Sequence, residues 1–151
     1  MTTFVLTEIA DVGTRQVETM ALGVNAAGKL TAPDIGKPVK LAGANNVVLC
    51  SAGDDIEGIL DSVEPHTVND GYGIGGVQRS GRRLAMVDAA QAGSLAVSDL
   101  VVSGAPAAVG TADTSYYPKV KGGAPTNFKW RVLRIVTSDG SAGSVVLIEK
   151  I

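Results

Sequence analysis

The sequence predicts an all-β protein, a small β-barrel or β-sandwich of short antiparallel strands from two pseudo-repeated halves, with an extended N-terminal arm. From Gly36 onward, glycine-bearing turns separate short apolar runs, which is typical of sandwiches and barrels. The runs are rich in valine and isoleucine, residue types that suit a pleated, half-buried surface. A polar turn, a brief apolar strand and a glycine occur together twice, at residues 36–43 and 97–104.

The N-terminal part of the chain differs from the rest. Gly13, Gly23, Gly28 and Pro33 interrupt any long periodic element. We therefore expect residues 1–35 to form an arm and residues 36–151 to form a β-barrel domain.

The repeated pattern extends beyond its first strand. In the first half, residues 56–63 and then 75–78 follow as further strands. In the second half, residues 130–136 and 143–147 follow in the same order. Two such units can close one small barrel but are too few for a solenoid, and the sequence leaves open whether the halves form one barrel.

Several turns are predicted between these strands. Asp139-Gly140 predicts a hairpin, because glycine takes the positive φ that the turn needs. Residues 79–82 predict a tight turn, and residues 88–92 predict one helical turn that ends at Gly93. Residues 105–123, with two prolines and several glycines, predict a long surface loop.

Composition limits the possible functions. The chain has 151 residues, which suggests one domain, and thirteen basic against fifteen acidic residues give a net charge of −2. This balance argues against direct nucleic-acid binding, which needs an excess of clustered Lys and Arg. We expect no signal peptide and no membrane span, because the chain has no apolar run of about 18 residues.

The motifs with possible chemistry are weak. Residues 71–76 match G-x-G-x-x-G, but a turn precedes them and a strand follows, whereas a dinucleotide site needs a strand before and a helix after. His66 is the only histidine and has no partner for a metal site. Cys50 is the only cysteine and lies in an apolar run that predicts a buried, inert thiol. We expect no cofactor, no metal, no catalytic residues and no enzymatic activity.

Two groups of charged residues have more than one interpretation. The acidic residues at positions 54, 55, 57 and 61 could serve acid–base chemistry or bind Ca²⁺, but we expect a solvated strand edge. Basic residues at 79–83 and 119–134, near Tyr116, Tyr117 and Trp130, could bind a single strand of nucleic acid. We favour a solvated or subunit-facing role for them, because Arg and Tyr are enriched at protein interfaces.

The order of these motifs resembles the capsid cement, or head decoration, proteins of tailed bacteriophages. The resemblance covers residues 36–151. It depends mainly on two short motifs, Gly53-Asp54-Asp55-Ile56-Glu57-Gly58-Ile59 and Ser98-Asp99-Leu100-Val101-Val102. The chain departs from the family pattern in its long insertion at residues 105–123.

The resemblance implies a structural virion protein that is made in the host cytoplasm and binds the exterior of the capsid. Its partners would be the major capsid protein and itself, with a homotrimer favoured over a dimer, and it would stabilise contacts between capsomers. We expect the arm to contact the capsid through Phe4, Val5, Leu6 and Ile9, and Tyr116, Tyr117 and Arg131 to lie at a subunit interface. The alternative is a carbohydrate- or host-surface-binding β module of a virion, which would need exposed aromatic residues lining one cleft.

Overall fold

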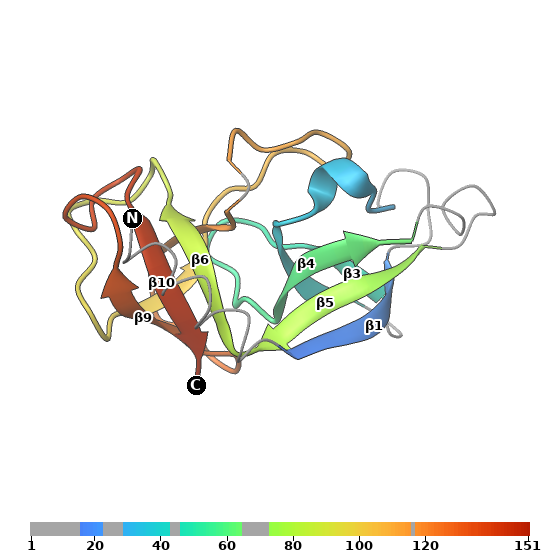
Figure 1. Cartoon of the computed structure of the whole chain (residues 1–151), viewed down its shortest axis with the longest axis horizontal. Helices are drawn as coiled ribbons and strands as arrows, with labels where there is room; N and C mark the ends of the chain where they lie inside the picture. Colours follow the sequence, from blue (N-terminus) through green and yellow to red (C-terminus); the bar gives the residue numbers. More distant parts are fainter. Residues whose placement is uncertain (1–15, 23–28, 43–45, 65–72, 116) are drawn as a thin grey trace.

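The computed structural model describes residues 16–22, 29–42, 46–64, 73–115 and 117–151. This part of the chain forms β-strands and one short 3-10 helix (Figure 1). The elements are β1 (Gln16–Leu22), η1 (Ala32–Asp34), β2 (Pro38–Ala42), β3 (Asn46–Leu49), β4 (Gly58–Val63), β5 (Ile74–Ser80), β6 (Arg82–Val87), β7 (Leu100–Ser103), β8 (Lys119–Gly122), β9 (Trp130–Ile135) and β10 (Val145–Lys150).

The strands close two barrels, which lie side by side along the chain's long axis (Figure 1). The first barrel has the strand order β1-β3-β2-β4-β5. The second has the order β6-β8-β7-β9-β10, which is the same order five strands later. In each barrel the first and third strands pair in parallel, and the other neighbours pair antiparallel.

The two barrels also agree residue by residue. Gly36 and Ser98 both have a positive φ at the start of the second strand, and both donate a backbone hydrogen bond to the fourth strand. Strand pairing then aligns the inward-facing positions of the two barrels. The aligned core pairs are Met20 and Ala85, Leu22 and Val87, Val39 and Val101, Val47 and Val120, Leu60 and Val132, and Val77 and Ile148.

The all-β fold from two repeated halves is confirmed, and each half closes a barrel of its own. The strand pairs that the sequence pattern matched are structural equivalents: β2 with β7, β4 with β9, and β5 with β10. The hairpin at Asp139-Gly140 is also confirmed, since β9 and β10 pair on either side of it and Gly140 has a φ of 86°.

Other predicted boundaries differ from the structure. The expected arm, residues 1–35, contains β1, which pairs with β3 and β5 as part of the first barrel. The expected loop at 105–123 contains β8, a strand of the second barrel. Residues 88–91 form a single β-turn, closed by a 3.0 Å hydrogen bond from Gln91 N to Asp88 O, and no helix.

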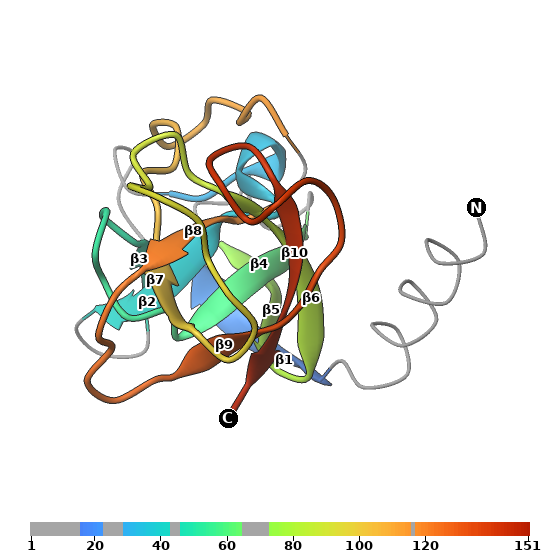
Figure 2. The same ribbon diagram turned by 90° about the vertical axis from the view of Figure 1, so that its left-hand side faces the viewer.

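Figure 2 views the molecule along its long axis, with the second barrel in front of the first. Gly81 alone separates β5 from β6, and its φ of 86° allows the chain to pass directly between barrels. The predicted tight turn at 79–82 is therefore a connection between barrels and not a hairpin, because β5 and β6 do not pair. The barrels have no room for a linker and pack directly together.

Candidate functional site

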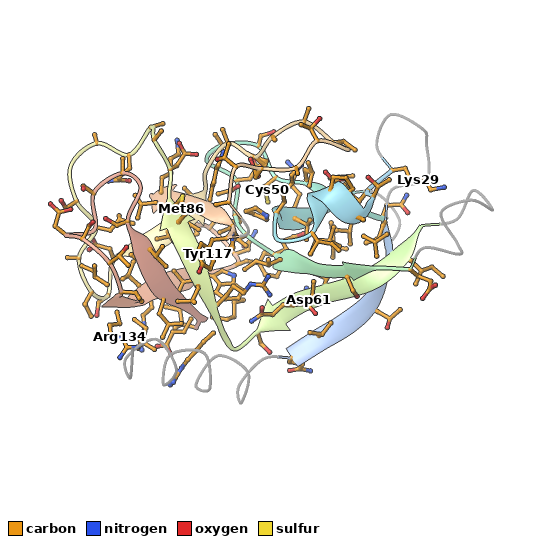
Figure 3. The ribbon with its side chains drawn as sticks, turned by 45° about the horizontal axis from the view of Figure 1, so that its top comes forward. Lys29, Cys50, Asp61, Met86, Tyr117 and Arg134 are labelled. Carbon is orange, nitrogen blue, oxygen red and sulfur yellow. The ribbon has the colours of Figure 1, made fainter. Side chains whose placement is uncertain are left out.

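The candidate functional site is the seam between the barrels, which we define as the contacts of η1, residues 53–56 and β4 with the second half of the chain. Side chains fill this region in Figure 3, where Cys50 and Asp61 are labelled on the first barrel and Met86 and Arg134 on the second. Polar and apolar contacts both contribute to it.

A buried ion pair forms one part of the seam. Pro33 in η1 turns the chain so that Asp34 and Lys37 face each other, and the Lys37 ammonium lies 2.7 Å from Asp34 Oδ1. The two side chains are 0% and 2% exposed. An isolated charge would be very costly at such a site, so both need further hydrogen-bond partners.

Those partners come from the second half of the chain. The Lys37 ammonium also donates to the backbone oxygens of Ala107, Ala108 and Thr111, at 3.1, 3.1 and 2.6 Å. Gly110 N donates to both Asp34 oxygens, at 3.0 and 3.1 Å. The segment before β8 therefore passes over η1, as Figure 1 shows, and the hydrogen bonds to Asp34 and Lys37 hold it in place.

Asp55 forms a second polar connection. Its carboxylate accepts backbone hydrogen bonds from Thr126, Asn127 and Phe128, at distances from 2.7 to 3.2 Å. These hydrogen bonds, first of all the one from Asn127, hold the pKa of Asp55 below its usual range. Successive backbone N–H groups that converge on one anion form a nest, and here the anion belongs to the other barrel.

Apolar contacts join the two cores beside Asp55. Ile56 and Ile59 belong to the first half by sequence but lie in the core of the second barrel, and both are fully buried. Trp130 is fully buried there too, and its indole N–H donates to the Ile56 carbonyl at 3.0 Å. The second barrel's core is thus completed by residues of the first half.

Backbone and charged contacts complete the seam. Gly53 N donates to Ser103 O and Ser103 N donates to Asp54 O, both at 2.9 Å, so a loop of the first barrel pairs with the end of β7. At the Gly81 connection, Arg83 donates to Asp61 at 3.0 Å and to the buried Gln78 at 3.3 Å.

The acidic residues of the sequence therefore have internal partners, which differs from the predicted solvated edge. Asp55 and Asp61 bind groups of the second half, and Asp54 pairs with Lys40 at 2.6 Å within the first. The Lys40 ammonium lowers the pKa of Asp54, and Asp54 in turn raises the pKa of Lys40. Sequence spacing could not reveal the cross-barrel partners, since they lie more than seventy residues away for Asp55.

The predicted contact residues fall in different places. Phe4, Val5, Leu6, Ile9 and Tyr116 lie outside the described residues. Tyr117 is half-buried just before β8, on the second barrel (Figure 3). Arg131 on β9 donates to Glu149 on β10 at 2.6 and 2.8 Å, within its own barrel.

Several of the motifs with possible chemistry can be located among the described residues. Residues 74–80 of the glycine-rich region form β5, so no helix follows Gly71–Gly76 to receive a phosphate. Cys50 is 3% exposed, which confirms that its thiol is buried, and burial raises the pKa of that thiol to about 12. No group of three or more potential metal ligands occurs among the described residues. In the same part of the chain, no helix has the length and hydropathy needed to cross a bilayer.

Sequence reasoning missed a groove on the outer face of the first barrel. It has a volume of about 300 Å³ and lies over β1, β4 and β5. The signal that could have found it is the pair Gly75-Gly76, which occupies the places of Val146-Leu147 in the second half.

No match to the chain was found among protein-family models, curated proteins or solved structures.

Proposed function

We propose that this chain is a structural virion protein that binds the outer surface of a phage capsid and stabilises contacts between capsomers. The observation that carries the proposal is the seam, which joins two small barrels into one body through buried charge, backbone hydrogen bonds and a shared core. A protein that braces a shell has to transmit force between its contacts, and such a body resists bending between its halves.

Three further features support this role. The motif order resembles capsid cement proteins over residues 36–151. The barrels have closed sheets, which leaves no strand edges for uncontrolled pairing on a crowded surface. In the described residues, the acidic and basic side chains at the seam form buried ion pairs and hydrogen bonds, and no cluster of potential metal ligands occurs. A protein that braces a shell needs only binding surfaces.

The proposed partners are the major capsid protein and further copies of this chain, with a homotrimer favoured. In this proposal Phe4, Val5, Leu6 and Ile9 contact the shell, while Tyr116, Tyr117 and Arg131 contact a neighbouring subunit. Many copies on one shell would add avidity to individually weak contacts.

The alternative, a carbohydrate- or host-surface-binding module, has less support. That function would use exposed aromatic residues, with Trp130 as the largest of them. Trp130 is fully buried and hydrogen-bonded to Ile56, so it cannot line a surface cleft.

Co-sedimentation tests the proposal. Purified full-length chain is mixed with empty, expanded capsids assembled from the major capsid protein of the same phage, and the mass of the free chain is measured in parallel. Saturable binding at a fixed copy number per capsid is the expected result. A chain that stays in the supernatant at all concentrations would refute the capsid role.

A variant lacking residues 1–12 tests the arm. We expect it to keep the buried-Trp130 fluorescence of the intact chain but to bind capsids more weakly. Unchanged binding would remove the arm from the mechanism while leaving the capsid role intact.

A further inference from the structure

The groove on the first barrel has a mixed lining. Val17 on β1, Val63 on β4 and Ile74 on β5 supply its apolar walls, Gly75 and Gly76 lie between them, and Thr19, Ser62 and Glu64 contribute polar groups. Val17 and Ile74 are 44% and 39% exposed, although both are large apolar residues. β5 runs between β1 and β4, so the groove follows the middle strand of this face (Figure 1).

The second barrel shows what the same face looks like when it is filled. Strand pairing places Leu84 at the position of Thr19, because Thr19 pairs with Gly76 as Leu84 pairs with Leu147. Leu84 and Leu147 are 7% and 3% exposed and lie outside the core cluster of their barrel. The repeat therefore carries two buried leucines where the first barrel has a threonine and a glycine.

Small residues also line the groove beside its apolar walls. A Cβ on Gly76 would lie 2.7 Å from Ser62 Oγ and 2.8 Å from Val17 Cγ1, so these two side chains already occupy the space next to Gly76. Ser62 in turn occupies the place of Arg134 in the second barrel. Three neighbouring positions thus carry smaller side chains than their equivalents in the second barrel.

We propose that this groove receives the N-terminal segment of the same chain, with Phe4, Val5, Leu6 and Ile9 supplying the apolar side chains. Residues 1–15 precede Gln16, and this segment joins β1 one residue before Val17, at the edge of the groove. Residues 10–15 can span roughly 20 Å when extended. The stretch of β1 from Val17 to Ala21 covers only about 13 Å, so a folded-back segment reaches the whole groove.

The tether favours the same chain over a second copy. A ligand joined to its site by a short covalent tether can reach an effective concentration in the millimolar range, well above that of a second copy in dilute solution. The proposal concerns the free protein and does not depend on capsid binding, so its test contains no capsids. A segment held by a few apolar contacts can still be transferred to a larger apolar partner.

Photo-crosslinking tests the proposal on the full-length chain. Phe4 is replaced by p-benzoylphenylalanine, the dilute protein is irradiated, and the adducts are located by mass spectrometry. We expect adducts within one chain, on peptides that contain Val17, Val63 or Ile74. Adducts on another surface, adducts at the mass of a dimer, or no adducts would each overturn the proposal.

Filling the groove provides the second arm of the test. Thr19→Leu and Gly76→Leu install the leucines of the second barrel, and we expect either to reduce the groove adducts at least fivefold. Ser94→Leu, which adds a leucine to an exposed loop of the second barrel, is the matched control and should change nothing. If Gly76→Leu fails to fold because of its contact with Ser62, Thr19→Leu still decides, and full crosslinking in Thr19→Leu would contradict the proposal.

Discussion

At the scale of single residues, burial separates two lysine–aspartate pairs that look alike by distance. Lys37 lies 2.7 Å from Asp34, and Lys40 lies 2.6 Å from Asp54. The first pair is almost completely buried, whereas the side chains of the second are 37% and 31% exposed. Solvent screening weakens an exposed pair, while breaking a buried pair leaves a charge without compensation.

Removing each lysine should therefore have very different effects. Lys37→Ala leaves the Asp34 carboxylate buried with Gly110 and Thr31 as its remaining partners, and we expect a loss of about 3–5 kcal/mol in the free energy of unfolding. Lys40→Ala is the matched control, with an expected loss below about 1 kcal/mol. Urea unfolding of both variants measures the difference, and equal losses would show that the buried pair does not fasten the seam.

The Asp55 nest predicts a specific pH dependence. Its pKa is lowered in the folded protein by the three backbone N–H groups, so the ionised carboxylate stabilises the fold above the unfolded pKa of about 3.9. That stabilisation is lost as the pH falls through the folded pKa. We expect Asp55→Asn to cost about 1.5 kcal/mol at pH 7, at the low end for hydrogen bonds to a charged group because Asp55 is partly exposed.

Urea unfolding of both proteins from pH 7 down to pH 2 checks this prediction. The difference in stability between wild type and Asp55→Asn should shrink below about pH 4, the unfolded carboxyl pKa. A difference that stays constant over this range would mean that the charge of Asp55 contributes nothing to the seam.

At the scale of elements, the repeat explains which strands could be predicted from sequence. β2 and β7 share a turn with positive φ and a valine core position, at Val39 and Val101. The repeat of these two strands can therefore be recognised in the amino-acid sequence. β8 has one buried apolar residue, Val120, between two lysines, so its sequence resembles a loop. β1 begins with four exposed residues, three of them polar, and has glycines on both flanks, so its sequence resembles an arm more than a strand.

The seam is harder to predict than the strands. Ile56 and Ile59 have the spacing of ordinary core residues, and nothing local shows that their core belongs to the other barrel. The partners that Asp55 and Lys37 find in the second half are backbone groups, which carry no sequence signal. Only the packing of one completed barrel on the other reveals them.

The shared core predicts a strong effect from one side chain. Ile56→Ala removes a fully buried side chain from the second barrel's core, and we expect a loss of about 2–5 kcal/mol. Val97→Ala is the control, since Val97 is 56% exposed and should change stability by less than about 0.5 kcal/mol. Trp130 fluorescence during urea unfolding measures both, and a small effect of Ile56→Ala would show that the barrels have independent cores.

At the scale of the whole molecule, the seam decides whether two barrels behave as one domain. Each barrel repeats the same topology, and a tandem repeat can unfold in parts when its units contact only weakly. Here the first half supplies core residues to the second, and the second half supplies the partners of the buried Asp34–Lys37 pair. If the first barrel unfolds, the core of the second loses Ile56 and Ile59. If the second barrel unfolds, the buried Asp34–Lys37 pair loses its backbone hydrogen-bond partners.

We therefore expect the two barrels to unfold in a single transition. Trp130 reports on the second barrel by fluorescence, and Cys50 reports on the first, because its thiol is buried and its pKa is raised to about 12. A buried thiol with a raised pKa reacts very slowly at pH 8, so labelling of Cys50 requires opening of the structure around it. The urea midpoints from fluorescence and from pulsed thiol labelling should coincide. Labelling of Cys50 at a lower urea concentration than the loss of the Trp130 signal would mean that the first barrel opens alone, and a body that opens in parts could not brace neighbouring capsomers in the way proposed.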